Sequence, residues 1–123
     1  MITLKNRVHM FAHPKHKETL TAFFTKALGC KAMEAPGSLP QPILAFIFSD
    51  GSSLSLELTE DCEDALTEKQ ARRGVWLELE TDDPVALQKK ILEAGYHQFD
   101  YTKGFFYFQI PGGQVMRIKL PDN

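Results

Sequence analysis

The chain has 123 residues, a net charge of −2 at neutral pH, 43% hydrophobic and 24% charged residues, which is typical of one soluble globular domain, here residues 1–123. The weak net charge disfavours binding to nucleic acid or an anionic membrane, and the sequence shows neither a run long enough to span a bilayer nor a secretion-signal pattern. Two cysteines, Cys30 and Cys62, are too few to staple a chain of this size, so we expect reduced thiols and a cytoplasmic protein.

The first half of the chain begins with an alternating strand and an amphipathic helix. Val8, Met10 and Ala12 form the apolar face of the strand, and His9, Phe11 and His13 form its other face. Apolar residues recur at helical spacing from Lys17 to Leu28, and Gly29 is a natural helix end. We then expect a short strand at Cys30–Glu34, a loop at Ala35–Pro42, and strands at Ile43–Phe48 and Leu54–Leu58 joined by a turn at Asp50–Gly51.

The second half repeats this order after a charged connector, residues 61–73, which has weak helical character around Ala65–Ala71. We expect the helix of the second half to begin here, with Asp83 as its N-cap and Pro84 as its first residue. The expected strands are Gly74–Glu80, Tyr96–Tyr101, Phe105–Ile110 and Val115–Leu120, the last two joined by a turn at Gly112–Gly113. Each half therefore reads β-α-β-β-β, with a first module at 6–60 and a second at 74–120. The predicted fold class is α+β, two βαβββ modules forming an open, cleft-lined barrel.

Strand alternation predicts where functional side chains lie. The two helices must bury their apolar stripes against the apolar strand faces, so the opposite faces of the strands are left for function. We call each of these opposite faces the site face of its sheet. They carry His9, Phe11 and His13, then Ser53, Ser55 and Glu57, then Gly74, Trp76 and Glu78, and finally Val115, Arg117 and Lys119. A solvated sheet surface would explain polar residues, but Phe11 and Trp76 favour a pocket for a small molecule.

The sequence resembles the vicinal oxygen chelate superfamily of glyoxalases, bleomycin-resistance proteins and extradiol dioxygenases. The likeness rests on the duplicated unit, on F-F-x-x-x-L-G from Phe23 to Gly29, and on I-P-G-G-Q-V-M-R-I from Ile110 to Ile118. It implies the fold well and the activity poorly, because this fold hosts many reactions. Such proteins often pair into homodimers, and the excess of aromatic residues on the later strands agrees with a partner surface.

The resemblance also implies four metal-ligand positions, of which this chain keeps two. They fall on His9, on Glu57 (or Ser55, if the strand register differs), on Gly74 and on Arg117. Glycine has no ligand atom and arginine is a cation, whereas a catalytic zinc ion normally has three protein ligands. His13 is the one further candidate for a third metal ligand. We therefore expect no cofactor, and a divalent metal held by His9 and Glu57 is the alternative.

Each site residue has a structural and a functional interpretation. Arg117 could pair with Glu57 and fill the vacated metal position, or could anchor a ligand carboxylate or phosphate. His9 and Glu57 are the candidate catalytic residues, because imidazole exchanges protons near neutral pH, although His9 could simply join a polar network. Trp76 and Phe11 are candidates either for ligand contacts or for residues of the hydrophobic core. Glu78 is either a second catalytic acid or base or a solvated surface carboxylate.

Two functions follow from these interpretations. The leading hypothesis is a glyoxalase/bleomycin-resistance-like protein that binds a small molecule in the concave cleft without the usual metal, through Phe11, Trp76, Glu78 and Arg117. The alternative is a divalent-metal-dependent lyase or dioxygenase that uses His9 and Glu57. Whether the protein is an enzyme is left open by the sequence.

Overall fold

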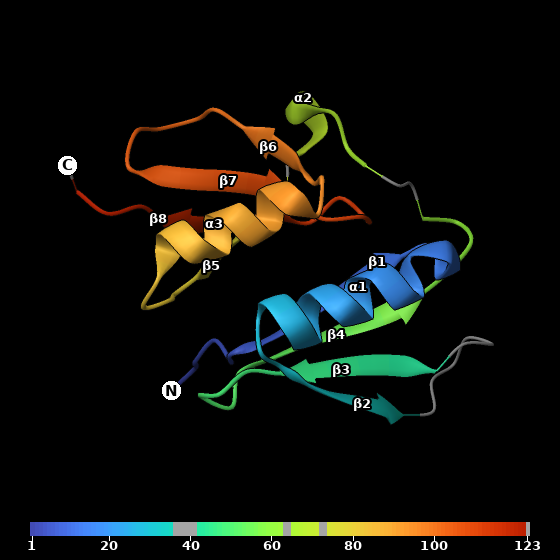
Figure 1. Ribbon diagram of the computed structural model, residues 1–123. Coiled ribbons are helices and arrows are strands. Elements are labelled where there is room, and N and C mark those ends of the chain that lie inside the picture. Colours follow the sequence, from blue (N-terminus) through green and yellow to red (C-terminus); the bar gives the residue numbers. More distant parts are fainter. Residues whose placement is uncertain (36–41, 63–64, 72–73, 123) are drawn as a thin grey trace. The chain divides into compact units, whose positions relative to one another are not determined.

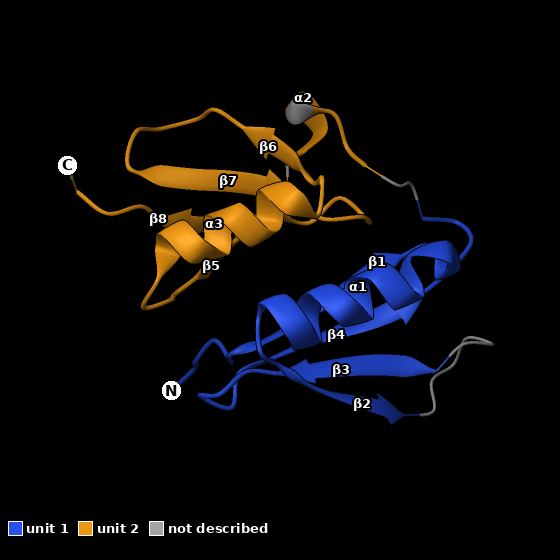
Figure 2. Ribbon diagram, in the orientation of Figure 1, with its two compact units in different colours: residues 1–62 blue, residues 63–123 orange. Residues whose placement is uncertain are grey.

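The computed structural model describes residues 1–35, 42–62, 65–71 and 74–122, and the chain divides into two compact units, Met1–Cys62 and Glu63–Asn123 (Figures 1 and 2). Most of the loop predicted at Ala35–Pro42 lies outside the described residues. No helix in the described part of the chain is both long and apolar enough to cross a membrane.

Unit 1 is a four-stranded mixed sheet with one helical segment. Its strands have the order β1-β4-β3-β2, with β1 parallel to β4 and the other neighbours antiparallel. The elements are β1 (Arg7–Ala12), the 3-10 turn η1 (Pro14–His16), α1 (Lys17–Ala22), its π-helical continuation η2 (Phe23–Ala27), β2 (Lys31–Ala35), β3 (Ile43–Ile47) and β4 (Ser53–Leu58). The helix ends where predicted, since Gly29 takes a φ of +72° that favours glycine.

Unit 2 repeats this topology. Its sheet has the order β5-β8-β7-β6, again with the first pair parallel and the others antiparallel. The elements are α2 (Glu68–Ala71), β5 (Trp76–Leu79), α3 (Pro84–Glu93), β6 (His97–Phe99), β7 (Phe105–Gln109) and β8 (Val115–Lys119). As predicted, Asp83 caps α3, because its carboxylate accepts a 3.0 Å hydrogen bond from the Ala86 backbone N–H.

Two corrections concern where strands begin and end. The fifth strand begins at Trp76, so Gly74 lies outside it. The first strand ends at Ala12, and His13 instead turns the chain into η1, where its Nδ1 accepts a 3.1 Å hydrogen bond from the Lys15 N–H. His13 therefore does not continue the strand alternation on which its candidacy as a third metal ligand depended.

The predicted strand alternation is confirmed for β1, β4 and β8. In unit 1, Met10, Ala12 and the three leucines of β4 are buried, and Phe24 of η2 stacks on Phe46 with ring centroids 4.6 Å apart. In unit 2, Met116 and Ile118 of β8 are buried, as are the inward residues of α3. Helices α1 and α3 each lie over one face of their own sheet (Figure 1). The α+β class and the two βαβββ modules are thus confirmed, while the open barrel and the single-domain boundaries stay predictions.

Candidate functional site

In unit 1, the predicted residues His9 and Glu57 are in contact on the site face. His9 Nε2 lies 3.1 Å from Glu57 Oε1, and the His9 ring meets Phe11 edge to face with centroids 5.4 Å apart. The register of β1 and β4 aligns His9 with Ser55 and Phe11 with Glu57, so the pair is diagonal across two neighbouring strands. Ser55 and Glu57 share this face, and it is Glu57 that the imidazole contacts.

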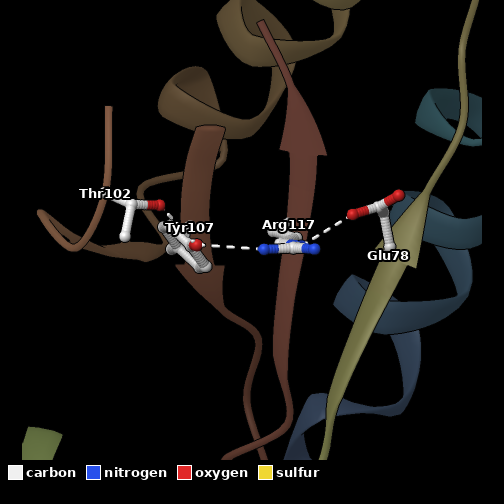
Figure 3. A network of polar contacts seen from close by, with 4 residues as sticks. All are labelled: Glu78, Thr102, Tyr107 and Arg117. Carbon is white, nitrogen blue, oxygen red and sulfur yellow. Dashed lines mark hydrogen bonds and ion pairs between the residues drawn. The ribbon is translucent and has the colours of Figure 1, made fainter. Parts of the chain in front are cut away.

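In unit 2, Arg117 is the centre of a row of polar side chains that crosses three strands (Figure 3). Its Nε donates a 2.7 Å hydrogen bond to Glu78 Oε1 on β5, and its Nη1 donates a 3.1 Å hydrogen bond to the Tyr107 hydroxyl on β7. The Tyr107 hydroxyl in turn shares a 2.8 Å hydrogen bond with Thr102 Oγ1. The order follows from the sheet, because the register places Glu78 and Tyr107 on either side of Arg117.

The guanidinium is fixed in place but not covered. Its carbon lies 4.1 Å from the centre of the Phe105 ring, which adds a cation–π contact to the two hydrogen bonds. The pKa of Arg117 is raised, first by the hydrogen bond with Tyr107 and then by Glu78, so the side chain is a permanent cation. It is nevertheless 33% exposed, and the contacts of the described residues engage its Nε and Nη1, leaving the Nη2 donors for another group.

Within unit 2, the carboxylate partner of Arg117 is Glu78, whereas the pair with Glu57 proposed from the sequence would join the two units and stays a prediction. Arg117 pairs with Glu78 of its own sheet, whereas Glu57 contacts His9 of its own sheet. The reason is register: β5 and β8 are parallel neighbours, and they place residues 78 and 117 side by side. Glu78 therefore acts as an orienting partner of the guanidinium, a role that the sequence had not suggested for it.

Trp76 is half-buried, within an aromatic cluster on the same site face. Its ring meets Tyr101 and Tyr107 edge to face, with centroids 4.8 Å and 5.3 Å apart, and its Nε1 donates a 3.2 Å hydrogen bond to the Ala71 carbonyl. Sequence reasoning missed Tyr107, Phe105 and Thr102. An assumed hairpin register around Gly112–Gly113 would have found Tyr107, because that register pairs Tyr107 with Arg117.

Beside this network lies a depression of about 460 Å³ at the ends of β5 and β8. Its lining includes Glu78, Glu80 and Asp122 against the single cation Lys119. Three carboxylates and one ammonium group repel an anion, so an anionic group on the site face is better placed at Arg117 than in this depression.

The residues present do not fit the metal site implied by the resemblance. Of its four positions, one is a glycine outside β5, and another is Arg117, a cation that is hydrogen-bonded to a carboxylate. Within the described ranges, no group of three or more histidine, cysteine, aspartate or glutamate side chains is arranged to hold a metal ion. The remaining two, His9 and Glu57, fall short of the three protein ligands of a catalytic zinc site.

The sequence matches no protein-family model and no curated protein. Solved structures with the same fold include a glyoxylase/bleomycin resistance protein/dioxygenase domain from Frankia sp. EAN1pec, with a TM-score of 0.73, 14% identity, and 99% and 100% of the two chains covered. Another is a variant of the fosfomycin resistance protein FosX from Listeria monocytogenes, complexed with Mn(II) and 1S,2S-dihydroxypropylphosphonic acid, with a TM-score of 0.66, 12% identity, and 99% and 93% covered. A third is TnmS3, an antibiotic binding protein from Streptomyces sp. CB03234, with a TM-score of 0.62, 17% identity, and 98% of both chains covered.

These similarities define the fold. The chain has the glyoxalase/bleomycin-resistance fold of the vicinal oxygen chelate proteins, and the resemblance predicted from its sequence is confirmed at that level.

Proposed function

We propose that this protein binds a small organic anion on the site face of its second sheet, with Arg117 as the anchor and without a metal at the usual positions. The supporting observation is the Arg117 guanidinium itself, which three contacts hold in one orientation while a third of the side chain stays exposed. A cation that is oriented before the ligand arrives loses little conformational freedom on binding. Carboxylate, phosphate and phosphonate groups accept two parallel hydrogen bonds from such a group.

The surrounding charges and rings favour an anion that carries an apolar or aromatic body. Glu78 offsets the charge of Arg117, and Lys119 on the same face adds a second cation, which lines the depression together with Glu80 and Asp122. Phe105, Tyr107 and Trp76 supply aromatic surface next to the cation. Two proteins of the same fold are described with small molecules, one with a phosphonic acid and one as an antibiotic binding protein, which supports binding of an organic molecule here.

Phenylphosphonate is a suitable probe, because it joins a ring to a dianion. We expect isothermal titration calorimetry to detect its binding to the unmodified protein, and the Arg117→Gln variant to bind at least about tenfold more weakly, since a charge-assisted pair is lost. The affinity of Arg117→Lys should be intermediate, because lysine keeps the positive charge but cannot donate two parallel hydrogen bonds to the anion. Arg7→Gln is the matched control, an exposed arginine on β1. Equal affinity in Arg117→Gln and the unmodified protein would refute the proposal.

The second candidate function is a divalent-metal lyase or dioxygenase. It is favoured by one contact, the 3.1 Å approach of His9 to Glu57, which brings two possible ligands together. Elemental analysis of protein purified without chelator tests it: near-stoichiometric zinc, nickel, iron or manganese that is lost in His9→Ala would support this function over the metal-independent one.

Homodimer formation and a cytoplasmic location stay predictions. Several aromatic residues on the later strands, which were assigned from the sequence to a partner surface, are buried inside unit 2: Phe99, Phe106, Tyr107 and Phe108. In unit 1, by contrast, Phe11 and Met33 are 48% and 58% exposed. Sedimentation velocity of the unmodified protein measures the oligomeric state directly.

A further inference from the structure

The segment Ala65–Ala71, which contains α2, lies across the site face of the second sheet; we call it the strap. The residues of the sheet that it contacts, Gln109, Val115 and Trp76, are aligned with one another by the strand register and so lie on the face away from the buried Met116 and Ile118. The connector predicted from the sequence is therefore, in part, a cover for the aromatic surface on which a ligand was expected.

One anchor of the strap is Leu66. The side chain of Gln109, only 3% exposed, accepts a 2.6 Å hydrogen bond from the Leu66 N–H and donates a 3.1 Å hydrogen bond to the Leu66 carbonyl. This pair resembles the hydrogen bonds that a neighbouring strand would make. The Leu66 side chain fills the space beside Gly113 so closely that a Cβ on that glycine would stand 2.7 Å from Leu66 Cγ.

The other anchor is Ala71. It is 4% exposed and packs in one cluster with Phe99, Tyr107 and Val115, while its carbonyl accepts the hydrogen bond from Trp76 Nε1. The indole donor and part of the aromatic surface next to Arg117 are thus occupied by the chain itself.

Outside these two anchors, the described side chains of the strap do not pack into the core of unit 2. The side chains of Ala65, Thr67, Lys69 and Gln70 are exposed. Thr67 and Gln70 form a reciprocal capping box within the strap, with hydrogen bonds of 2.9 Å and 3.2 Å between each backbone N–H and the other's side-chain oxygen. A single helical turn is only marginally stable in water, so the strap keeps its place through its two anchors.

We infer that the strap is an internal competitor of the ligand: it opens locally, and the aromatic surface around Trp76 accepts the apolar body of the bound anion only when the strap is displaced. This inference rests on the proposed function for its ligand class. A ligand that binds only the open form has its apparent affinity reduced by the fraction of molecules that are open, so weakening an anchor tightens binding.

Trp76, the only tryptophan, reports on the strap without any ligand. Leu66→Ala weakens one anchor by removing the side chain beside Gly113 while leaving the two backbone hydrogen bonds to Gln109, and Lys69→Ala on the exposed side of the strap is the matched control. We expect acrylamide to quench Trp76 fluorescence at least about twice as efficiently in Leu66→Ala as in the unmodified protein, and equally in Lys69→Ala, because local opening exposes the indole. Gln109→Met, which cuts the same anchor from the side of the sheet, should behave like Leu66→Ala.

Phenylphosphonate titration of the same proteins tests competition. Binding should be roughly three- to thirtyfold tighter in Leu66→Ala and unchanged in Lys69→Ala. Unchanged quenching in both anchor variants would show that the strap does not open, and raised quenching with unchanged or weaker affinity would show that it does not compete; either result overturns the inference. Absence of phenylphosphonate binding in every protein, including the anchor variants, refutes the proposed function and with it the competition, whereas the quenching data still decide whether the strap opens.

Discussion

Replacing Gln109 with methionine tests the strap at a buried hydrogen-bonded contact. The substitution preserves length and volume but removes the donor and the acceptor that hold the Leu66 backbone at 2.6 Å and 3.1 Å. Two such hydrogen bonds contribute about 1–3 kcal/mol in net terms. The free energy of strap opening should fall by that amount, which corresponds to roughly 5- to 150-fold faster amide exchange in the strap.

The informative amide is that of Ala71. Its N–H donates to the Thr67 carbonyl at 2.8 Å, a bond that the substitution does not touch, so faster exchange there reports opening of the whole strap. Hydrogen–deuterium exchange followed by NMR gives this rate. Gln98→Met, an exposed glutamine on β6, is the matched control, and the amide of Met116 on β8 should keep its protection in both variants.

The reasoning would be refuted if Ala71 exchanged at the same rate in Gln109→Met and the unmodified protein while the Leu66 amide exchanged faster. That result would mean that the two hydrogen bonds are lost without any loosening of the strap. Burying a methionine in place of a glutamine also removes a desolvation cost, so the midpoint of global unfolding should change less than the local exchange rate.

Two further predictions concern the elements beneath the site. Asp83→Ala should lower the free energy of unfolding of unit 2 by about 1 kcal/mol, because the Ala86 N–H loses its cap, while Asp82→Ala should have little effect in the same urea titration followed by circular dichroism. Burial raises the pKa of the Cys30 thiol to about 11, so in a Cys62→Ser variant iodoacetamide at pH 8 should modify the native protein at least about a hundredfold more slowly than the urea-unfolded protein. The neutral buried thiol favours the folded state below the pKa of the unfolded thiol, and this stability should be lost as the pH rises through 11. Alkylation at equal rates in both states would contradict the assignment.

The repeated pattern of the sequence predicted the fold because hydrophobic periodicity and the residues that begin and end helices act locally. The alternation of Val8, Met10 and Ala12 requires a buried strand face, Asp83 with Pro84 begins α3, and Gly29 ends the first helix through its positive φ. Each of these signals depends on a few neighbouring residues, and the structure bears each of them out.

The partners across the site could not be predicted in the same way, because they depend on strand register and on tertiary contacts. Alternation predicted that Arg117 shares a face with Glu78, but only the parallel pairing of β5 with β8 puts the two side by side. The strap was missed for a similar reason. Its sequence reads as a charged connector, and the lone polar Gln109 in an aromatic strand gave no indication of which backbone it would bind.

Metal dependence of anion binding tests the central proposal most directly. Calorimetric titration of phenylphosphonate into the unmodified protein, in EDTA and again with excess manganese chloride, separates an arginine anchor from a metal anchor. With Arg117 holding the anion, the dissociation constant should be the same under both conditions. Binding that appears only with manganese, and that His9→Ala abolishes, would contradict the proposed site.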